Sequence, residues 1–234
     1  MCFTPIVSLS FAVIEFTLAT ILIVFFKKTY LRDFFAAIIY VLGSYQFTEF
    51  MLCTTSHPIL WAKLGFIAYS FLPAIGFHAM VKIFKKKINL FWIYLIPFSA
   101  SLMAISSSNF IINAQCSRFF VDVFFNEGIG LELIRNLNYW LYMTYYFGFI
   151  VLSLFIVIKD FFHQKNKIKK LIDEDIAIGI TLMMVPTFIL IVVFRFSQIK
   201  FPSILCGFAI FVAITAFFAV YLESRKKNFN KVFK

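Results

Sequence analysis

The chain of 234 residues is 62% hydrophobic and only 14% charged, and its mean hydropathy is +0.91. Soluble domains are about 45–50% apolar and about 25% charged, so this composition excludes an ordinary soluble globular protein. The formal net charge of +11 does not indicate a nucleic-acid partner, because the basic residues lie at the ends of apolar runs, where they orient membrane proteins.

Seven apolar segments are long enough to cross a lipid bilayer as helices. A spanning helix needs about 20 mostly apolar residues for a hydrocarbon core about 30 Å thick. We therefore expect an all-α membrane protein, with residues 1–234 forming one seven-transmembrane helix bundle embedded in the lipid bilayer. The predicted spans are residues 6–26, 34–53, 61–84, 88–106, 137–158, 176–194 and 201–222, with an outer loop at 107–136 and a cytoplasmic tail at 223–234.

The basic residues predict that the N-terminus lies outside the cytoplasm and the C-terminus inside. Most of the 22 basic residues lie in the segments 27–32, 82–87, 159–170 and 225–234. The five others are Lys63, Arg118, Arg135, Arg195 and Lys200. Because basic residues stay on the cytoplasmic side, the four basic segments mark the inner ends of the spans.

Two of the loops contain further structural signals. Asp173, Glu174 and Asp175 come directly before span six, and we interpret them as first-turn acids that complement the helix dipole. In the outer loop, Arg118–Phe125 is β-prone and is followed by turn residues, so that Ile129–Arg135 could return beside it. The loop therefore predicts a β-hairpin between spans four and five, with an interfacial helix as the alternative.

Three ionisable residues lie within the predicted spans, where such groups are costly and usually face the protein interior or water. Glu15 has no basic residue at comparable depth, so we expect it to be protonated or hydrogen-bonded, and a plain packing contact is the alternative. Glu49 lies near the outer end of span two, where a solvated position and a ligand contact are both open. For His78 we favour a structural hydrogen bond to a facing carbonyl over a pH switch.

Span five has a continuous aromatic face, formed by Tyr142, Tyr145, Tyr146 and Phe149 at helical spacing. Lining of a pocket and packing against other helices are both open interpretations of this face. Pro73 lies within span three, where a proline kinks the helix and opens space between neighbours.

The four cysteines, Cys2, Cys53, Cys116 and Cys206, all map to the outer half of the predicted topology. A disulfide is permitted there if that side is oxidising, and one between Cys53 and Cys116 would tie the outer loop to the end of span two. Sequence alone does not fix the pairing. We favour four free thiols, with this disulfide as the alternative.

Familiar catalytic and cofactor motifs are not found in the sequence. It contains no His-Glu-x-x-His, no Gly-x-Ser-x-Gly and no phosphate-binding loop. Span seven contains no lysine for a retinal Schiff base, and only His78 lies within a span, which excludes bis-histidine haem in one chain. We therefore expect no enzymatic activity, no metal and no cofactor.

Two segments resemble the N-terminal seven-transmembrane sensor region of bacterial histidine kinases. Tyr40–Glu49 contains a glycine and an acidic residue late in span two, and Trp61–His78 begins with tryptophan and continues to a Leu-Pro step and a histidine. The segments Asn126–Gly128, Tyr139–Tyr146 and Pro202–Cys206 are similar to the family's hairpin, span-five and span-seven regions. The resemblance covers about residues 35–222.

The resemblance implies a multi-pass protein of the bacterial inner membrane, with an extracytoplasmic N-terminus and a ligand-sensing bundle that signals through span seven. The sequence departs from the family because it contains no kinase domain. It therefore implies either a stand-alone receptor, whose partner is a separate cytoplasmic signalling protein or a second copy, or a fragment of a longer sensor.

The leading hypothesis is a receptor-like module that binds a small apolar or amphipathic ligand from the outer side. The residues we expect to contact that ligand are Glu49, Trp61, Tyr69, Tyr142 and Tyr146. One rival is a transporter with Glu15 and His78 on a proton path. Another is a structural subunit of a larger membrane complex.

Overall fold

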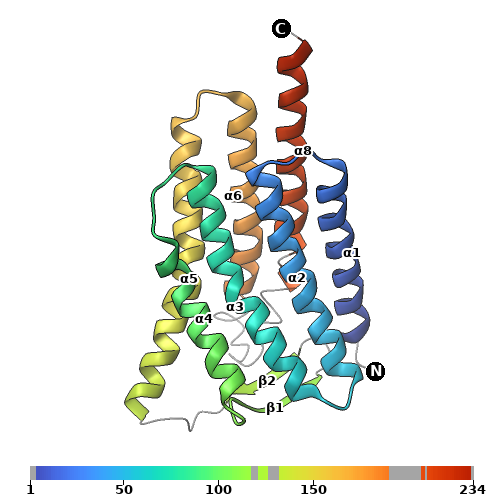
Figure 1. The fold of residues 1–234 in the computed structure, drawn as a ribbon, viewed down its shortest axis with the longest axis vertical. Coiled ribbons are helices and arrows are strands. Elements are labelled where there is room, and N and C mark those ends of the chain that lie inside the picture. The colour runs from blue at the N-terminus through green and yellow to red at the C-terminus, as the bar shows by residue number, and fades with distance from the viewer. Residues whose placement is uncertain (1–3, 117–120, 126–131, 190–206, 209, 233–234) are drawn as a thin grey trace.

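The computed structural model describes residues 4–116, 121–125, 132–189, 207–208 and 210–232, and shows a bundle of helices with a two-stranded sheet at one end (Figure 1). In chain order the elements are α1 (Thr4–Phe25), α2 (Tyr30–Thr54), α3 (Pro58–Ile83), α4 (Leu90–Ser106), β1 (Ile111–Cys116), β2 (Val121–Phe125), α5 (Glu132–His163), α6 (Lys167–Phe188) and α8 (Ile210–Val232).

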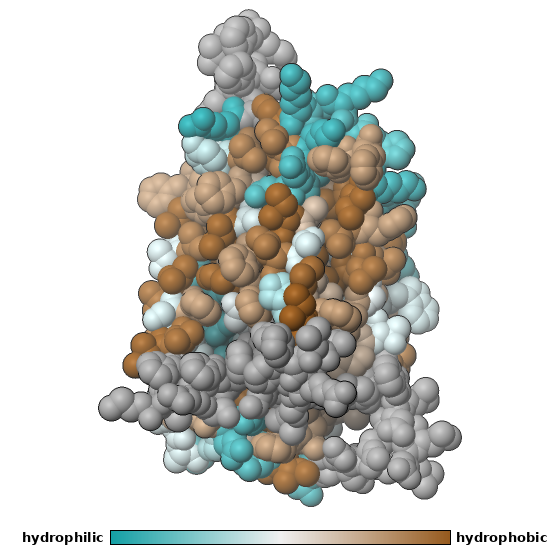
Figure 2. All heavy atoms as spheres, turned by 180° about the vertical axis from the view of Figure 1, so that it is seen from behind, coloured by the Kyte–Doolittle hydropathy of each residue, from teal (hydrophilic) through white to brown (hydrophobic). Residues whose placement is uncertain are grey.

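The expected helical membrane protein is confirmed. Four helical segments of the described chain are long and apolar enough to cross a membrane, and they are Pro5–Phe25, Tyr30–Thr54, Pro58–Ile83 and Leu141–His163. Leu90–Ser106 is a shorter apolar helix. Large apolar side chains such as Phe25, Trp92 and Phe155 are 60–78% exposed, and an apolar band covers the middle of the face in Figure 2. Lipid would cover this surface in place of water.

The basic loops lie together at one end of the bundle. In Figure 1 the loops after α1, α3 and α5 and the C-terminal end of α8 are at one end, and the N-terminus and the sheet are at the other. Three helices that begin at the basic end have a capping side chain, from Thr29, Asn89 or Asn166, that accepts from first-turn backbone N–H groups at 3.0–3.2 Å. These caps satisfy amides that a helix leaves unpaired, so they fix where the helices start.

The hairpin is present, but its strands differ from those predicted. Val121–Phe125 pairs antiparallel with the preceding Ile111–Cys116. The predicted return strand Ile129–Arg135 is wrong, since α5 already begins at Glu132, and the interfacial-helix alternative is wrong for both strands. Ile111, Ala114 and Val121 form an apolar cluster against α2 and α3, and this burial favours the observed pairing. The predicted turn at 126–128 lies outside the described residues.

The acidic run before span six is not in a first turn. Helix α6 begins at Lys167, because Asn166 caps it and Ile168, Ile172 and Ile176 continue its apolar face. Asp173 is therefore in the second turn, is only 4% exposed, and shares a hydrogen bond with Asp160 of α5.

The last two predicted spans are described only in part. The end of span six at 190–194 and the start of span seven at 201–206 lie outside the described residues. Helix α8 continues through most of the predicted tail to Val232, and in Figure 1 it extends beyond the rest of the bundle. The helix therefore continues ten residues past the predicted end of span seven at residue 222.

We predict that Asp173 makes the protein less stable as the pH rises from about 4 to about 7. Burial, and to a lesser extent the Asp160 carboxyl, raise the pKa of Asp173 from 3.8 to about 7, and Lys169 opposes this increase. The folded protein then holds a proton that the unfolded chain has already released, so stability falls between about pH 4 and about pH 7 and is level above that range.

Thermal unfolding in detergent at pH 6 and pH 8 tests this expectation. The apparent Tm of the unmutated protein should be lower at pH 8, whereas Asp173→Asn should show a smaller fall and should exceed the unmutated protein at pH 8. Glu174→Gln is the control, since Glu174 is exposed, and should keep the original fall. An undiminished fall in Asp173→Asn would contradict the assignment.

Candidate functional site

A proline interrupts the hydrogen bonding of α3, and tyrosines of α5 bind the helix there. Pro73 has no N–H, and its ring crowds the preceding turn. Tyr145 Oη donates to the Ser70 carbonyl at 2.7 Å, while Tyr142 Oη and Ser70 Oγ lie 2.8 Å apart. The two hydroxyls fasten α5 to α3 immediately before the proline.

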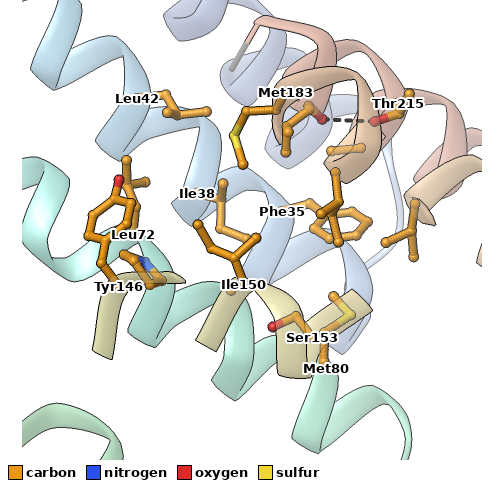
Figure 3. A pocket seen from close by; sticks show the side chains of 16 residues that line it. Phe35, Ile38, Leu42, Leu72, Met80, Tyr146, Ile150, Ser153, Met183 and Thr215 are labelled. Carbon is orange, nitrogen blue, oxygen red and sulfur yellow. Dashed lines mark hydrogen bonds between the residues drawn. The ribbon is translucent and has the colours of Figure 1, made fainter. Parts of the chain in front are cut away.

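A cavity of about 100 Å³ lies beside this joint, in the middle of the bundle. Its walls come from five helices, for example Leu42 of α2, Gly76 of α3, Ile150 of α5, Met183 of α6 and Ala216 of α8 (Figure 3). About 15 Å³ is enough for one water molecule, so this space can hold a small ligand.

The cavity wall is almost entirely apolar. Ser153 Oγ donates to the Phe149 carbonyl at 2.7 Å, and Thr215 Oγ1 donates to carbonyls of its own helix at 3.0 and 3.2 Å. The single O–H donor of each of these hydroxyls is therefore already used. None of the described residues that line the cavity is charged. An uncharged apolar molecule is the ligand class that fits such a wall.

Gly76 explains part of the empty space. A Cβ placed on Gly76 would meet no atom within 4 Å. Pro73 also lines the cavity, so a proline and a glycine one turn apart leave the wall of α3 without bulky side chains. This pairing is the sequence signal that could have located the cavity. The residues from α6 and α8, such as Met183 and Thr215, have no comparable signal.

A second cavity of about 20 Å³ lies under the hairpin, with room for about one water. Glu49, Trp61 and Tyr69 line it, and β2 covers it with Val121, Val123 and Phe125. Three of the five residues that we expected to contact a ligand thus line one cavity, between the ends of α2 and α3 that lie beside the hairpin.

The other two predicted ligand residues lie elsewhere. Tyr146 lines the larger cavity, and the ring of Tyr142 stacks on Phe66 at 5.7 Å between centroids. Phe66, Tyr69, Tyr142 and Tyr146 form a chain of ring contacts at 5.3–6.1 Å, which occupies the space where we expected one continuous pocket. The aromatic face of α5 therefore has both of the roles left open by the sequence. Tyr146 lines a cavity, and Tyr142 packs against another helix.

The ionisable residues of the predicted proton path are not brought together. Glu15 faces Gly43 on one side of α2, and His78 packs its ring against Phe34, nine residues away and on the opposite side of that helix. His78 Nδ1 lies 2.9 Å from the hydroxyl of Tyr94, so its partner is a tyrosine of α4 and not a carbonyl.

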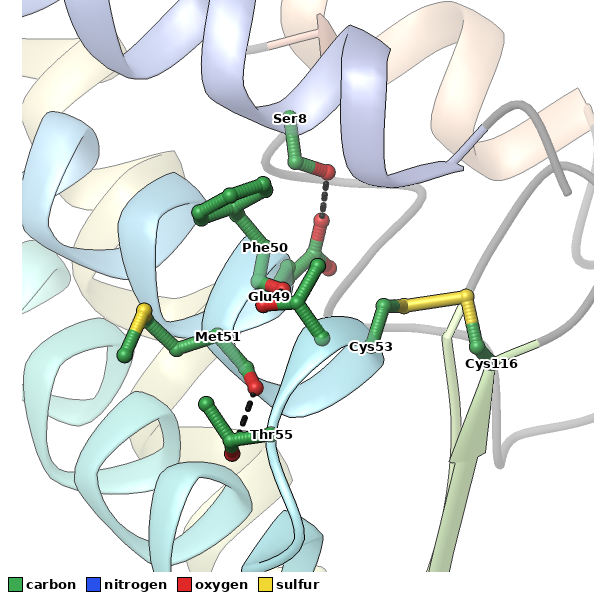
Figure 4. Close-up of a disulfide and its surroundings, with 8 residues drawn as sticks. Ser8, Glu49, Phe50, Met51, Cys53, Thr55 and Cys116 are labelled. Atoms are coloured by element: carbon green, nitrogen blue, oxygen red, sulfur yellow. Dashed lines mark hydrogen bonds between the residues drawn. A yellow bond between two sulfur atoms is a disulfide. The ribbon is translucent and has the colours of Figure 1, made fainter.

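A disulfide joins the hairpin to α2. Cys53 and Cys116 are bonded, with their Cα atoms 5.3 Å apart (Figure 4). Our preference for free thiols is wrong for this pair, since β1 passes directly beside the end of α2. Cys2 and Cys206 lie outside the described residues. The bond fixes the cover of the smaller cavity.

Comparisons with known proteins assign no family. The sequence matches no protein-family model, and no curated protein is significantly similar to it. The resemblance to histidine kinase sensors therefore stays a hypothesis. Among the described residues, no group of three or more His, Cys, Asp or Glu side chains could hold a metal ion.

Proposed function

We propose that this protein is a membrane sensor that binds a small uncharged apolar molecule in the larger cavity and signals through α8. The observation that carries the proposal is that α8 forms part of the cavity wall and then continues as one helix beyond the bundle. The site is deeper than the outer pocket expected from sequence, and the ligand is apolar rather than amphipathic.

The cavity favours such a ligand by the hydrophobic effect. Each methylene group moved from water into an apolar site contributes about 0.8 kcal/mol. A charged or strongly polar molecule would lose hydration there and would find no free O–H donor on Ser153 or Thr215 in return.

Helix α8 supports the signalling role because one part of it lines the cavity and a later part contacts the loop between α1 and α2. Val212, Thr215 and Ala216 line the cavity, so a bound molecule would contact α8 directly. Further along the same helix, Thr29 Oγ1 donates to Glu223 at 2.8 Å and ties α8 to the loop between α1 and α2. A ligand that displaces α8 would weaken this contact, and such a difference in contacts between two states is what signalling requires.

The full topology is part of the proposal. We place seven spans in a bacterial inner membrane, with the hairpin outside and the basic end inside, because cytoplasmic loops are rich in Lys and Arg. The basic end of α8 would then face the cytoplasm and could bind a separate signalling protein or a second copy. The resemblance to histidine kinase sensors supports the same arrangement.

Cysteine labelling tests the orientation. In a background with Cys2 and Cys206 replaced by serine, Asn113→Cys on β1 should react with a membrane-impermeant thiol reagent added to intact cells. Lys165→Cys, in the loop between α5 and α6, should react only after the membrane is opened. Both positions are exposed. The reverse pattern would overturn the orientation.

Filling the cavity tests the binding site. The side chain introduced by Gly76→Leu should fit into the cavity, because a Cβ at this position meets nothing within 4 Å. It should therefore displace the ligand. Gly148→Leu is the matched control, since Gly148 is equally open but does not line the cavity. A leucine side chain replaces about four methylene-sized groups at about 0.8 kcal/mol each, so retention should fall at least about tenfold.

The measurement is mass spectrometry of small molecules extracted from the purified proteins. An apolar molecule should be retained by the unmutated protein and by Gly148→Leu, and lost from Gly76→Leu. Equal profiles for all three proteins would contradict the proposed site.

A further inference from the structure

Helix α1 packs into the bundle along one narrow stripe, and a glutamate lies in its middle. The stripe consists of side chains that are at most 3% exposed, and these are Ser8, Ala12, Glu15, Ala19 and Leu22. Their spacing of four and three residues places them on one face. The small members let α1 approach α2 closely, so Glu15 is enclosed between the helices.

The carboxyl group of Glu15 is completely buried and has no hydrogen-bond partner among the described residues. Its Cβ faces α2, at 3.3 Å from where a Cβ on Gly43 would lie. An ionised carboxylate without a partner in an apolar interior is strongly unfavourable, so this group is neutral and holds a proton.

Glu49 lies six residues after Gly43, about 9 Å further along α2 towards the hairpin, and its surroundings differ from those of Glu15. Ser8 Oγ donates to its Oε2 at 3.0 Å (Figure 4), and Tyr45 Oη donates to its Oε1 at 2.8 Å. Two hydroxyl donors aimed at both oxygens suit an ionised carboxylate. Glu49 also borders the cavity of about 20 Å³ under the hairpin, where one water can reach it.

We propose that Glu15 and Glu49 form a proton-binding pair between α1 and α2, with one exchangeable proton held by Glu15 and an ionised Glu49 that connects it to water under the hairpin. Paired acids in unlike environments divide the roles of proton holder and carboxylate in this way. The ligand of this site is the proton itself.

Other titratable groups near the pair leave this assignment intact. Tyr45 donates to Glu49, and Tyr69 packs edge-on against Tyr45. Arg32 and Asp33 pair with each other at the far end of α2, and α8 has no titratable residue from Ile210 to Val220. Further described groups on α2, α3 and β2 include Tyr40 bonded to Thr20, Lys63 bonded to the Ser107 carbonyl, the buried Asp122, and His78 beside the Tyr94 hydroxyl.

The proton-binding pair would give α1 a function, since none of the residues that line the apolar cavity comes from this helix. Loss of the proton would place two negative charges between α1 and α2 and weaken their packing, so protonation would control how firmly α1 is held. This inference rests on different residues from the proposed ligand site, and either can fail without the other.

Infrared spectroscopy of the full chain in nanodiscs tests the pair at pH 8. Asp173→Asn serves as the background, because Asp173 has its pKa raised to about 7 and would contribute its own carboxylic acid signal. We expect a carboxylic acid C=O band that shifts in D₂O. Glu15→Gln, which keeps the shape of the neutral acid, should abolish it, and Glu49→Gln should retain it.

Three results would overturn the proposal. They are a band that persists in Glu15→Gln, a band that is lost only in Glu49→Gln, and a band that does not shift in D₂O. Labelling of the background protein with carboxyl-¹³C glutamate provides a second measurement that needs no substitution at the site. The band should shift with labelled glutamate and not with labelled aspartate, and the opposite result would contradict the assignment.

Discussion

The break in α3 at Pro73 is the constraint on which the centre of the molecule depends. Within a bilayer, backbone groups that lose a helical partner must find another inside the protein. Because Pro73 has no N–H, it cannot act as the helical donor to the carbonyl of Tyr69, four residues earlier. Tyr145 donates to the next carbonyl, that of Ser70, so α5 is held against α3 just before the proline. One turn later Gly76 contributes no side chain, and the helices enclose a cavity instead of a packed core.

The bundle thus separates two kinds of environment. The centre is an apolar space in contact with α8, suited to an uncharged molecule and to movement of that helix. The end nearer the hairpin is polar inside, where Ser8, Tyr45 and Glu49 form a hydrogen-bonded group and the Cys53–Cys116 disulfide fixes the cover. A ligand and a proton would act on different helices, which allows two inputs to one protein.

Sequence reasoning was strongest where composition alone decides the outcome. Long apolar runs predicted the helices, and the β-prone segment before Phe125 predicted a hairpin, because both signals are local. The strand partner Ile111–Cys116 was missed, since its burial against Leu52 and Ala62 is a tertiary effect. The larger cavity was missed for the same reason. It lies where five helices meet, and residues such as Met183 and Ala216 resemble any other core residues.

The most direct test of the central claim is a structure of the protein in nanodiscs under xenon pressure. Xenon binds empty apolar cavities and has no hydrogen-bonding preference. The account predicts density between Leu42, Gly76 and Met183 in the unmutated protein, from xenon or from the apolar molecule that the protein retains, and no density there in Gly76→Leu. An empty cavity in the unmutated protein, with xenon found only in the lipid, would contradict an accessible ligand site in the centre of the bundle.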